Sequence, residues 1–150
     1  MFLRKAPHPM LRIALLALVA LAPAASVSAE QAYSQKVEVT PLIAAMETVI
    51  GQPLVYPTGK AEVTAVIVTI PPGGETGWHE HQVPLFGYML DGVLTVDYGD
   101  KGVRVYETGD SLMEAMNWPH NGTNRGAVPV RILAVYIGAE GIPNATSVAK

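Results

Sequence analysis

From position 61 onward, the apolar residues fall in short runs with a two-residue period, which is the spacing of half-buried β-strands. Turn-forming glycine, proline and aspartate residues stand between the runs, as in Pro71-Pro72-Gly73-Gly74. Strands of this length, split by such turns, indicate an antiparallel sandwich or barrel, and Asp91-Gly92 is typical of a hairpin turn. The runs predict strands over residues 61–70, 85–90, 93–98, 103–107 and 130–137.

Residues 30–60 follow a less regular pattern. Lys36 to Thr40 alternates in the manner of a strand, and Pro41 to Ile50 fits either an amphipathic helix or an irregular arm. Gly51-Gln52-Pro53 ends this segment. We therefore expect a single domain over residues 30–150, made of an N-terminal arm at 30–60 and an all-β barrel at 61–150.

Residues 1–29 have the pattern of a secretory signal peptide. The apolar run stops at Pro23, short of the roughly 20 residues that span a bilayer. We expect cleavage after Ala29 and a periplasmic or secreted protein without a stable membrane anchor, the alternative being an uncleaved N-terminal anchor. A positive start, an apolar stretch and small residues follow one another: Arg4, Lys5 and Arg12, then residues 13–21, then Val27-Ser28-Ala29.

The composition fits a folded domain that holds together without disulfides. Of the 150 residues, 49% are hydrophobic and 15% charged, which excludes a disordered chain, and there is no cysteine. Loss of the signal removes three of the 10 basic residues and leaves seven against 13 acidic ones, a net charge of −6. Nucleic acid is therefore not an expected partner, because no excess of basic residues is present to neutralise phosphates.

Three histidines remain after the signal: His79, His81 and His120. In a strand, residues two apart point to the same face, so His79 and His81 project side by side, as two ligands of one ion must. Imidazole suits zinc, copper, iron and nickel, and His120 could complete the set if its strand faces the same interior. The alternative is a histidine pair on the surface or in the core that binds no metal.

Glycines and histidines recur here in two groups with regular spacing: first Gly73, His79, His81 and Gly92, then Gly109, His120 and Asn124. These spacings resemble the two motifs of the cupin superfamily. The resemblance covers about residues 61–137 and implies a double-stranded β-helix, the jelly-roll barrel of cupins, with a metal held by histidines. More narrowly, the chain is similar to the small single-domain exported cupins of bacteria.

The chain departs from the family pattern at a metal ligand. The glutamate of the first motif would fall at Leu85 or Phe86, and the proline and glycine of the second become Ala115 and Asn117. Three histidines still suffice for a divalent transition metal such as zinc, copper, iron, manganese or nickel, with water or substrate completing the shell. The resemblance supports such a site, because some cupin dioxygenases use three histidines.

Glu114, in the second motif, is the candidate for a replacement carboxylate. If it faces the cavity, it could bind the ion or act as a general base beside it; the alternative is an exposed or salt-bridged side chain. Glu75 shares the parity of His79 and is a weaker candidate. Gln82 is a candidate acceptor for a ligand histidine, since such rings donate their second N–H. Candidate pocket walls are Tyr88 and Trp118, together with Trp78, Met113 and Met116, while Asn124 is expected to bond backbone.

These residues favour a metal-dependent enzyme acting on a small molecule, with dioxygenase-, isomerase- or lyase-like chemistry implied by the resemblance. The alternative is a non-catalytic cupin that binds a small ligand or the metal itself. A homodimer through residues 30–60 is also implied by the resemblance. We expect metal affinity to fall below about pH 6, where ordinary imidazoles become protonated.

Overall fold

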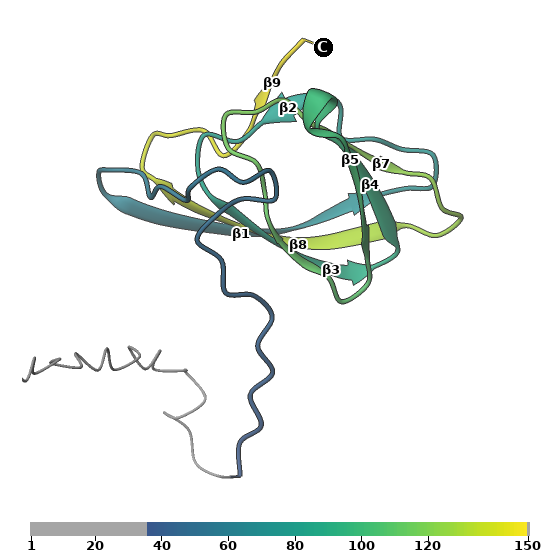
Figure 1. The fold of residues 1–150 in the computed structure, drawn as a ribbon, viewed down its shortest axis with the longest axis horizontal. Coiled ribbons are helices and arrows are strands. Elements are labelled where there is room, and N and C mark those ends of the chain that lie inside the picture. Colours follow the sequence, from purple (N-terminus) through teal and green to yellow (C-terminus); the bar gives the residue numbers. More distant parts are fainter. Residues whose placement is uncertain (1–35, 150) are drawn as a thin grey trace, which may run out of the picture. The chain divides into compact units, whose positions relative to one another are not determined.

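The computed structural model describes residues 36–149, so the predicted signal peptide and its predicted cleavage point lie outside the described residues. Within them, no helix has the length and apolar character of a membrane span. The chain divides into two units, residues 1–39 and 40–150, and every described strand belongs to the second. The elements are β1 (Ala61–Ile70), β2 (His79–Glu80), β3 (Leu85–Asp91), β4 (Val93–Asp97), the 3₁₀ helix η2 (Gly99–Lys101), β5 (Val103–Glu107), β6 (Ser111–Met113), β7 (Asn121–Asn124), β8 (Val130–Ala139) and β9 (Thr146–Ser147) (Figure 1).

The strands form antiparallel sheets that close into a jelly-roll barrel. One sheet has the order β1-β8-β3-β6 and a second the order β5-β4-β7, while β2 and β9 form a short two-stranded pair. Figure 1 shows β1, β8 and β3 side by side, with β4, β5 and β7 in a separate layer. The all-β class and the double-stranded β-helix expected from the sequence are confirmed.

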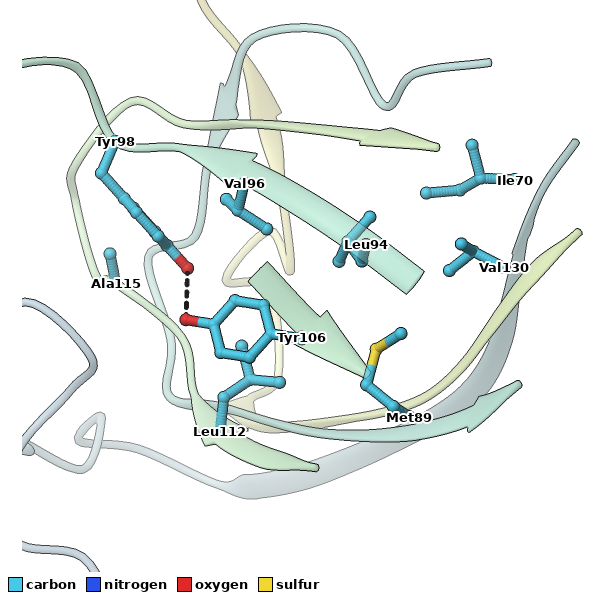
Figure 2. Packing of buried hydrophobic residues seen from close by; sticks show 9 residues of the cluster. All are labelled: Ile70, Met89, Leu94, Val96, Tyr98, Tyr106, Leu112, Ala115 and Val130. Carbon is cyan, nitrogen blue, oxygen red and sulfur yellow. Dashed lines mark hydrogen bonds between the residues drawn. The ribbon is translucent and has the colours of Figure 1, made fainter. Parts of the chain in front are cut away.

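The core lies between the two larger sheets. Alternation along β4 buries Leu94 and Val96, and Tyr98, which continues the same parity just past the strand, is fully buried. Met89 of β3 and Val130 of β8 come from the opposite sheet and are also fully buried (Figure 2). Burial of each such side chain stabilises the fold by about 1.5–3 kcal/mol, so the two sheets hold each other in place.

The sequence predicted the secondary structure of residues 36–60 less well than that of the barrel. The strand predicted over Lys36 to Thr40 is wrong, because these residues form no strand. Pro41 to Ile50 is the irregular arm and not the amphipathic helix. The arm is held by packing and backbone contacts in place of helical hydrogen bonds: Thr48 is buried, and the Val49 N–H donates to the Met113 carbonyl at 2.8 Å.

Gln52 fastens this arm to the loop that follows β6. Its Nε2 donates to the Met116 carbonyl at 2.7 Å, and its Oε1 accepts from the Met116 N–H at 3.0 Å. The side-chain amide therefore bonds both the N–H and the C=O of one residue, as a residue of a neighbouring antiparallel strand would. The loop it holds contains Glu114 and Asn117, and Asn117 has a φ of 48°, in the left-handed region that asparagine tolerates.

The hairpin predicted at Asp91-Gly92 is wrong. β3 pairs with β6 and β8, whereas β4 pairs with β5 and β7, so this turn carries the chain from one sheet to the other. Gly92 has a φ of 80°, and a Cβ added to it would lie 2.9 Å from the Pro129 carbonyl oxygen and 3.0 Å from the Val130 Cα. The crossing thus depends on a residue with neither a side chain nor a restricted φ.

Replacement of this glycine should weaken the barrel. Gly92→Ala combines left-handed strain with a backbone clash and should lower the free energy of unfolding by about 2–5 kcal/mol. Gly99→Ala is the matched control: its φ is 64°, and a Cβ added there would meet no atom within 4 Å, so it should cost only about 1–2 kcal/mol. Urea denaturation measures both, and equal losses would contradict the clash.

Candidate metal centre

His79 and His120 lie directly opposite each other on paired backbone segments. The His79 N–H donates to the His120 carbonyl at 3.0 Å, and the His120 N–H donates to the His79 carbonyl at 2.9 Å. Residues paired in this way project to the same face of the sheet. His81, two residues further on, is fixed by the Asn117 N–H, which donates to its carbonyl at 2.8 Å.

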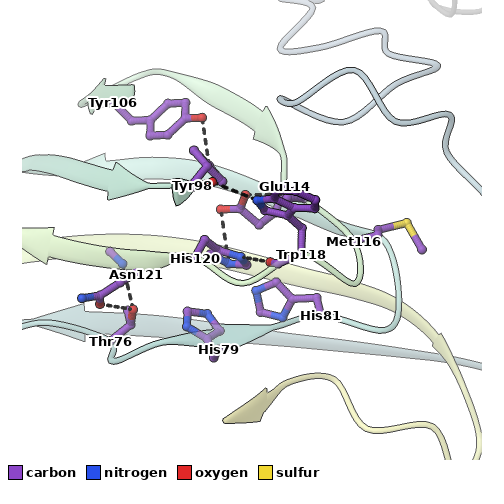
Figure 3. Close-up of polar contacts among 12 residues, drawn as sticks. Thr76, His79, His81, Tyr98, Tyr106, Glu114, Met116, Trp118, His120 and Asn121 are labelled. Atoms are coloured by element: carbon purple, nitrogen blue, oxygen red, sulfur yellow. Dashed lines mark hydrogen bonds and ion pairs between the residues drawn. The ribbon is translucent and has the colours of Figure 1, made fainter. Parts of the chain in front are cut away.

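This backbone arrangement brings the three imidazole rings together, as the sequence predicted. The ring centroids of His79 and His120 lie 4.4 Å apart, those of His79 and His81 4.9 Å, and those of His81 and His120 5.1 Å. One nitrogen from each ring lies within 4.8 Å of the other two. Figure 3 shows the three side chains pointing toward one another inside the barrel, so the group could hold a metal ion.

Each of the three rings is oriented by a backbone carbonyl. Nδ1 of His79 lies 2.9 Å from the Gly77 oxygen, Nδ1 of His81 2.8 Å from the Asn144 oxygen, and Nδ1 of His120 2.8 Å from the Trp118 oxygen. A carbonyl only accepts, so Nδ1 carries the hydrogen in every ring and Nε2 of the neutral ring carries a lone pair. Metal-binding histidines are held in this way.

His120 provides a direct test of whether these residues fit a metal. Its Nε2 is buried and has no hydrogen-bond partner among the described residues. A buried polar atom left unpaired costs about 1–3 kcal/mol, which makes such an atom rare in a folded protein. A cation beside Nε2 would remove this cost, so the donor set fits a transition metal that accepts imidazole ligands.

Burial keeps the three rings neutral. Desolvation lowers the pKa of His79 and His120 below the ordinary value and lowers that of His81 to about 3, even though each Nδ1 hydrogen bond acts in the opposite direction. Protons therefore compete with a metal less than free imidazole would allow. The loss of metal affinity that we expected near pH 6 should begin at lower pH.

Glu114 faces the same cavity as the histidines. It is buried, its Oε1 accepts from the Ala115 N–H at 2.7 Å, and its Oε2 lies 3.9 Å from Nε2 of His120 (Figure 3). Burial raises its pKa above the ordinary range. Of the predicted alternatives, the exposed side chain is wrong, whereas the side chain does lie within ion-pair distance of His120, whose ring is neutral.

The place of Glu114 in the sheet relates it to the missing carboxylate. The Glu114 N–H donates to the Leu85 carbonyl at 2.9 Å, so Glu114, just past the end of β6, lies directly beside Leu85 at the start of β3. Both side chains line the cavity that contains the three histidines. The chain thus has an apolar residue where the family motif has glutamate, and a glutamate one strand away on the same inner face.

Several predicted pocket residues lie elsewhere. Gln82 is exposed and borders a separate surface depression with Met116, so its predicted role as acceptor for a ligand histidine is wrong, because backbone carbonyls fill that role. Tyr88 alternates with the inward-facing Leu85 and Gly87 and does not line the cavity. Neither do Trp78 and Met113. Glu75 is exposed and accepts from the Asn121 amide at 2.9 Å.

Trp118 acts through its backbone and not as a wall of the cavity. Its carbonyl accepts from Nδ1 of His120, and its indole Nε1 donates to the Tyr98 carbonyl at 2.9 Å. The indole ring also lies under Lys101, whose Nζ is 5.2 Å from the ring centroid. Asn124 is fully buried and donates to the Ile70 and Val128 carbonyls, so its predicted backbone-bonding role is confirmed.

Sequence reasoning missed three tyrosines near the histidines. Tyr98 lies with its ring 5.6 Å from that of His120, and its hydroxyl is 3.2 Å from the Tyr106 hydroxyl. Burial raises the pKa of Tyr98, and that of Tyr106 to about 12, so both are neutral. Tyr136 lines the cavity beside His81. Parity could have found Tyr98 and Tyr136, which continue the inward-facing positions of β4 and β8.

The cavity around the histidines has a volume of about 160 Å³. Apart from the histidines and Glu114, its polar side chains are Thr76 and Tyr136, and the rest of the wall is apolar or glycine. Neither lysine nor arginine lines it within the described part of the chain.

Comparison with known proteins identifies the class. Residues 66–136 match the cupin domain family. Together with the double-stranded β-helix and the position of the histidines, this match identifies the barrel as a cupin domain. Among curated proteins, none matches the chain in sequence.

Solved structures with a similar fold include proteins of quite different size. An uncharacterised protein with a double-stranded β-helix domain from Klebsiella pneumoniae is 19% identical, with a TM-score of 0.51 over 75% of this chain and 91% of that one. The dimethylsulfoniopropionate (DMSP) lyase DddQ from Ruegeria pomeroyi is 19% identical, with a TM-score of 0.50 over 57% of this chain and 42% of that one. An oxalate decarboxylase from Lactobacillus farciminis is 25% identical, with a TM-score of 0.48 over 57% and 26%. The chain thus spans less than half of either enzyme.

The metal-free protein should lose stability as the pH falls below the pKa of a free imidazole, about 6.5. Unfolded histidines titrate near pH 6.5, whereas the folded pKa of His81 is about 3, so the unfolded chain binds more protons between these values. The free energy of unfolding should therefore fall with pH by up to about 1.4 kcal/mol per pH unit for this residue. Urea denaturation between about pH 7.5 and 4.5 measures the slope.

Glu114→Gln tests a group that affects the pH dependence of the free energy of unfolding in the opposite direction to the histidines. The raised pKa of Glu114 makes the folded state bind more protons than the unfolded one above the ordinary carboxyl pKa, so this group alone destabilises the fold as the pH rises. Its removal should steepen the histidine slope, whereas His81→Gln should flatten it. Identical slopes in the parent and both variants would contradict the burial of these charges.

Proposed function

We propose that this protein is an exported cupin that holds a divalent transition metal through His79, His81 and His120 and uses it in small-molecule chemistry. The convergence of three Nε2 lone pairs, each fixed by a carbonyl on Nδ1, is the observation that carries this proposal. Side chains that served only the core would not need three matched tautomers. The export signal in residues 1–29 and a dimer through residues 30–60 remain predictions.

The ion would be one of zinc, copper, iron, manganese or nickel, since imidazole suits these metals and affinity rises from manganese to copper. Export of the unfolded chain would favour zinc or copper, because metal loading would then occur outside the cytoplasm. When bound, the ion would act as a Lewis acid or redox centre at an open coordination position. The apolar wall around the histidines would exclude water from that position.

Glu114 is the acidic group that would serve this centre. Its Oε2 lies 3.9 Å from Nε2 of His120. Glu114 also lies beside Leu85, a position at which the family motif would carry glutamate. It can fill a fourth ligand position or hold a proton at Oε2 next to the bound substrate. Either role accounts for a carboxyl group buried among apolar side chains, which is otherwise unfavourable.

Each histidine should be needed for metal binding. His79→Ala, His81→Ala and His120→Ala should each lower metal affinity by more than about 100-fold. Removal of a hydrogen-bond partner of a metal ligand costs about 10–100-fold in affinity, and removal of the ligand itself should cost more. Elemental analysis of purified protein and competition with a chelator measure this. Gln82→Ala, exposed and off the cavity, is the control that should retain full occupancy. Full occupancy in a histidine variant would remove that residue from the site.

A carboxylate exchange between neighbouring strands tests the ligand role of Glu114. Glu114→Leu should lower metal affinity at least about tenfold, and Leu85→Glu added to it should restore most of the loss, because the two positions face the ion from adjacent strands. Circular dichroism monitors folding in both. Unchanged affinity in Glu114→Leu would eliminate the ligand role and leave the proton-holding one.

An enzyme is distinguished from a non-catalytic binder by turnover. Oxygen consumption by the metal-loaded protein with small phenols, diketones and thiols would support dioxygenase-like chemistry, and product analysis of the same mixtures covers isomerase- and lyase-like reactions. Metal-loaded protein that converts none of them would favour a binder of a small ligand or of the metal.

A further inference from the structure

We propose that the cavity accepts a small ligand with a single acidic head group and an apolar body, and that it rejects dicarboxylates of similar size. This inference rests on the proposed metal site, which would supply the position for the head group. It adds a substrate class that the fold alone does not specify, because cupins as a fold host unrelated chemistries.

The charge distribution of the cavity carries the argument. A bound divalent ion would be the sole full positive charge in the cavity, since no lysine or arginine of the described residues lines it. Arg104 acts on Glu114 only through space, and its side chain is exposed on β5. One anionic head group can therefore pair with the ion, but a second carboxylate would find no cation.

A second carboxylate would instead meet apolar side chains from both sheets. These are Val68, Leu94, Val96, Leu112, Ile132 and Ala134. An ionised group buried without a partner is strongly disfavoured, whereas a methylene chain in the same place is favoured. Tyr136 adds a hydroxyl to this wall but no charge, because burial raises its pKa. Glu114 would repel a second anion or, if protonated, offer it one hydrogen bond.

The size of the cavity limits the apolar body. An apolar cavity of roughly 150 Å³ holds a benzene molecule, and this cavity has about 160 Å³. Small residues stand at several wall positions, namely Gly87, Gly122, Ala134 and Ala145. The wall is already closely packed at Gly87, because a Cβ added there would approach the Leu112 side chain to 3.0 Å. A single ring or a short chain is therefore the largest body that fits.

A series of carboxylates tests this class on the zinc-loaded protein by isothermal titration calorimetry. Affinity should rise from acetate to butanoate by about fourfold for each methylene group, the factor expected for burial of apolar surface. Hexanoate and succinate have the same number of non-hydrogen atoms, and succinate should bind at least about tenfold more weakly. Succinate that binds as tightly as hexanoate, or an affinity independent of chain length, would overturn the inference.

Matched variants show whether the effect comes from this cavity. Ala134→Leu should fill it, so that acetate still binds while the gain from a longer chain is lost. Val135→Leu adds one carbon atom, against three in Ala134→Leu, at the next position of β8, which does not line the cavity, and should behave as the parent. Should Ala134→Leu fail to fold, Ala145→Leu at an exposed wall position replaces it. Retention of the chain-length gain in the filled cavity would count against the inference.

Zinc content, measured before each titration, separates the two proposals. Protein that takes up no zinc would overturn both the metal site and the ligand class. Protein that holds zinc but binds succinate as well as hexanoate would overturn only the ligand class and leave the metal site in place.

Discussion

The pair of hydrogen bonds between the backbones of His79 and His120 is the interaction on which the centre depends. These residues lie 41 positions apart in sequence, yet each accepts from and donates to the other, so their side chains must emerge together. His81 follows from the two-residue period of an extended chain, and its carbonyl is tied to Asn117. The three rings are thus placed by backbone pairing, before any metal is considered.

The polar groups of the centre are costly to the apo protein. Three imidazoles and a carboxyl group lie among apolar side chains, and the Nε2 of His120 lacks a partner among the described residues. The core between the sheets offsets this cost, because side chains such as Leu94 and Met89 are buried almost completely. A barrel with this balance keeps its donor atoms in position for a ligand, in the way that functional sites commonly trade stability for preorganisation.

Much of the fold followed from local pattern. The two-residue period located the strands from Ala61 onward, and the spacing of glycines and histidines indicated both the barrel and the convergence of the rings. The second motif also pointed to Glu114 as a candidate for the site. Pattern failed at Asp91-Gly92 because a turn signal does not say whether the next strand pairs with the last one or joins another sheet. It failed for Gln82 because a backbone carbonyl, which every residue carries, supports each ring.

The arm was ambiguous for a related reason. Apolar residues such as Val49 and Ile50 pack against the core without regular backbone bonding, and irregular packing leaves no periodic signal. The ligand class proposed for the cavity could not be inferred from the sequence either. It depends on the absence of lysine and arginine from the described wall, which in turn depends on which strands face each other. No single stretch of sequence contains that information.

The two hydrogen bonds between Gln52 and Met116 mean that the candidate metal centre depends on a residue outside the two cupin motifs. Gln52 precedes residues 66–136, the part that matches the family, by more than ten positions. The loop bearing the carboxyl group is thus braced from a segment that carries no family signature. Excision of the barrel alone, for transplantation into another scaffold, would preserve every imidazole and still leave that loop without its external support.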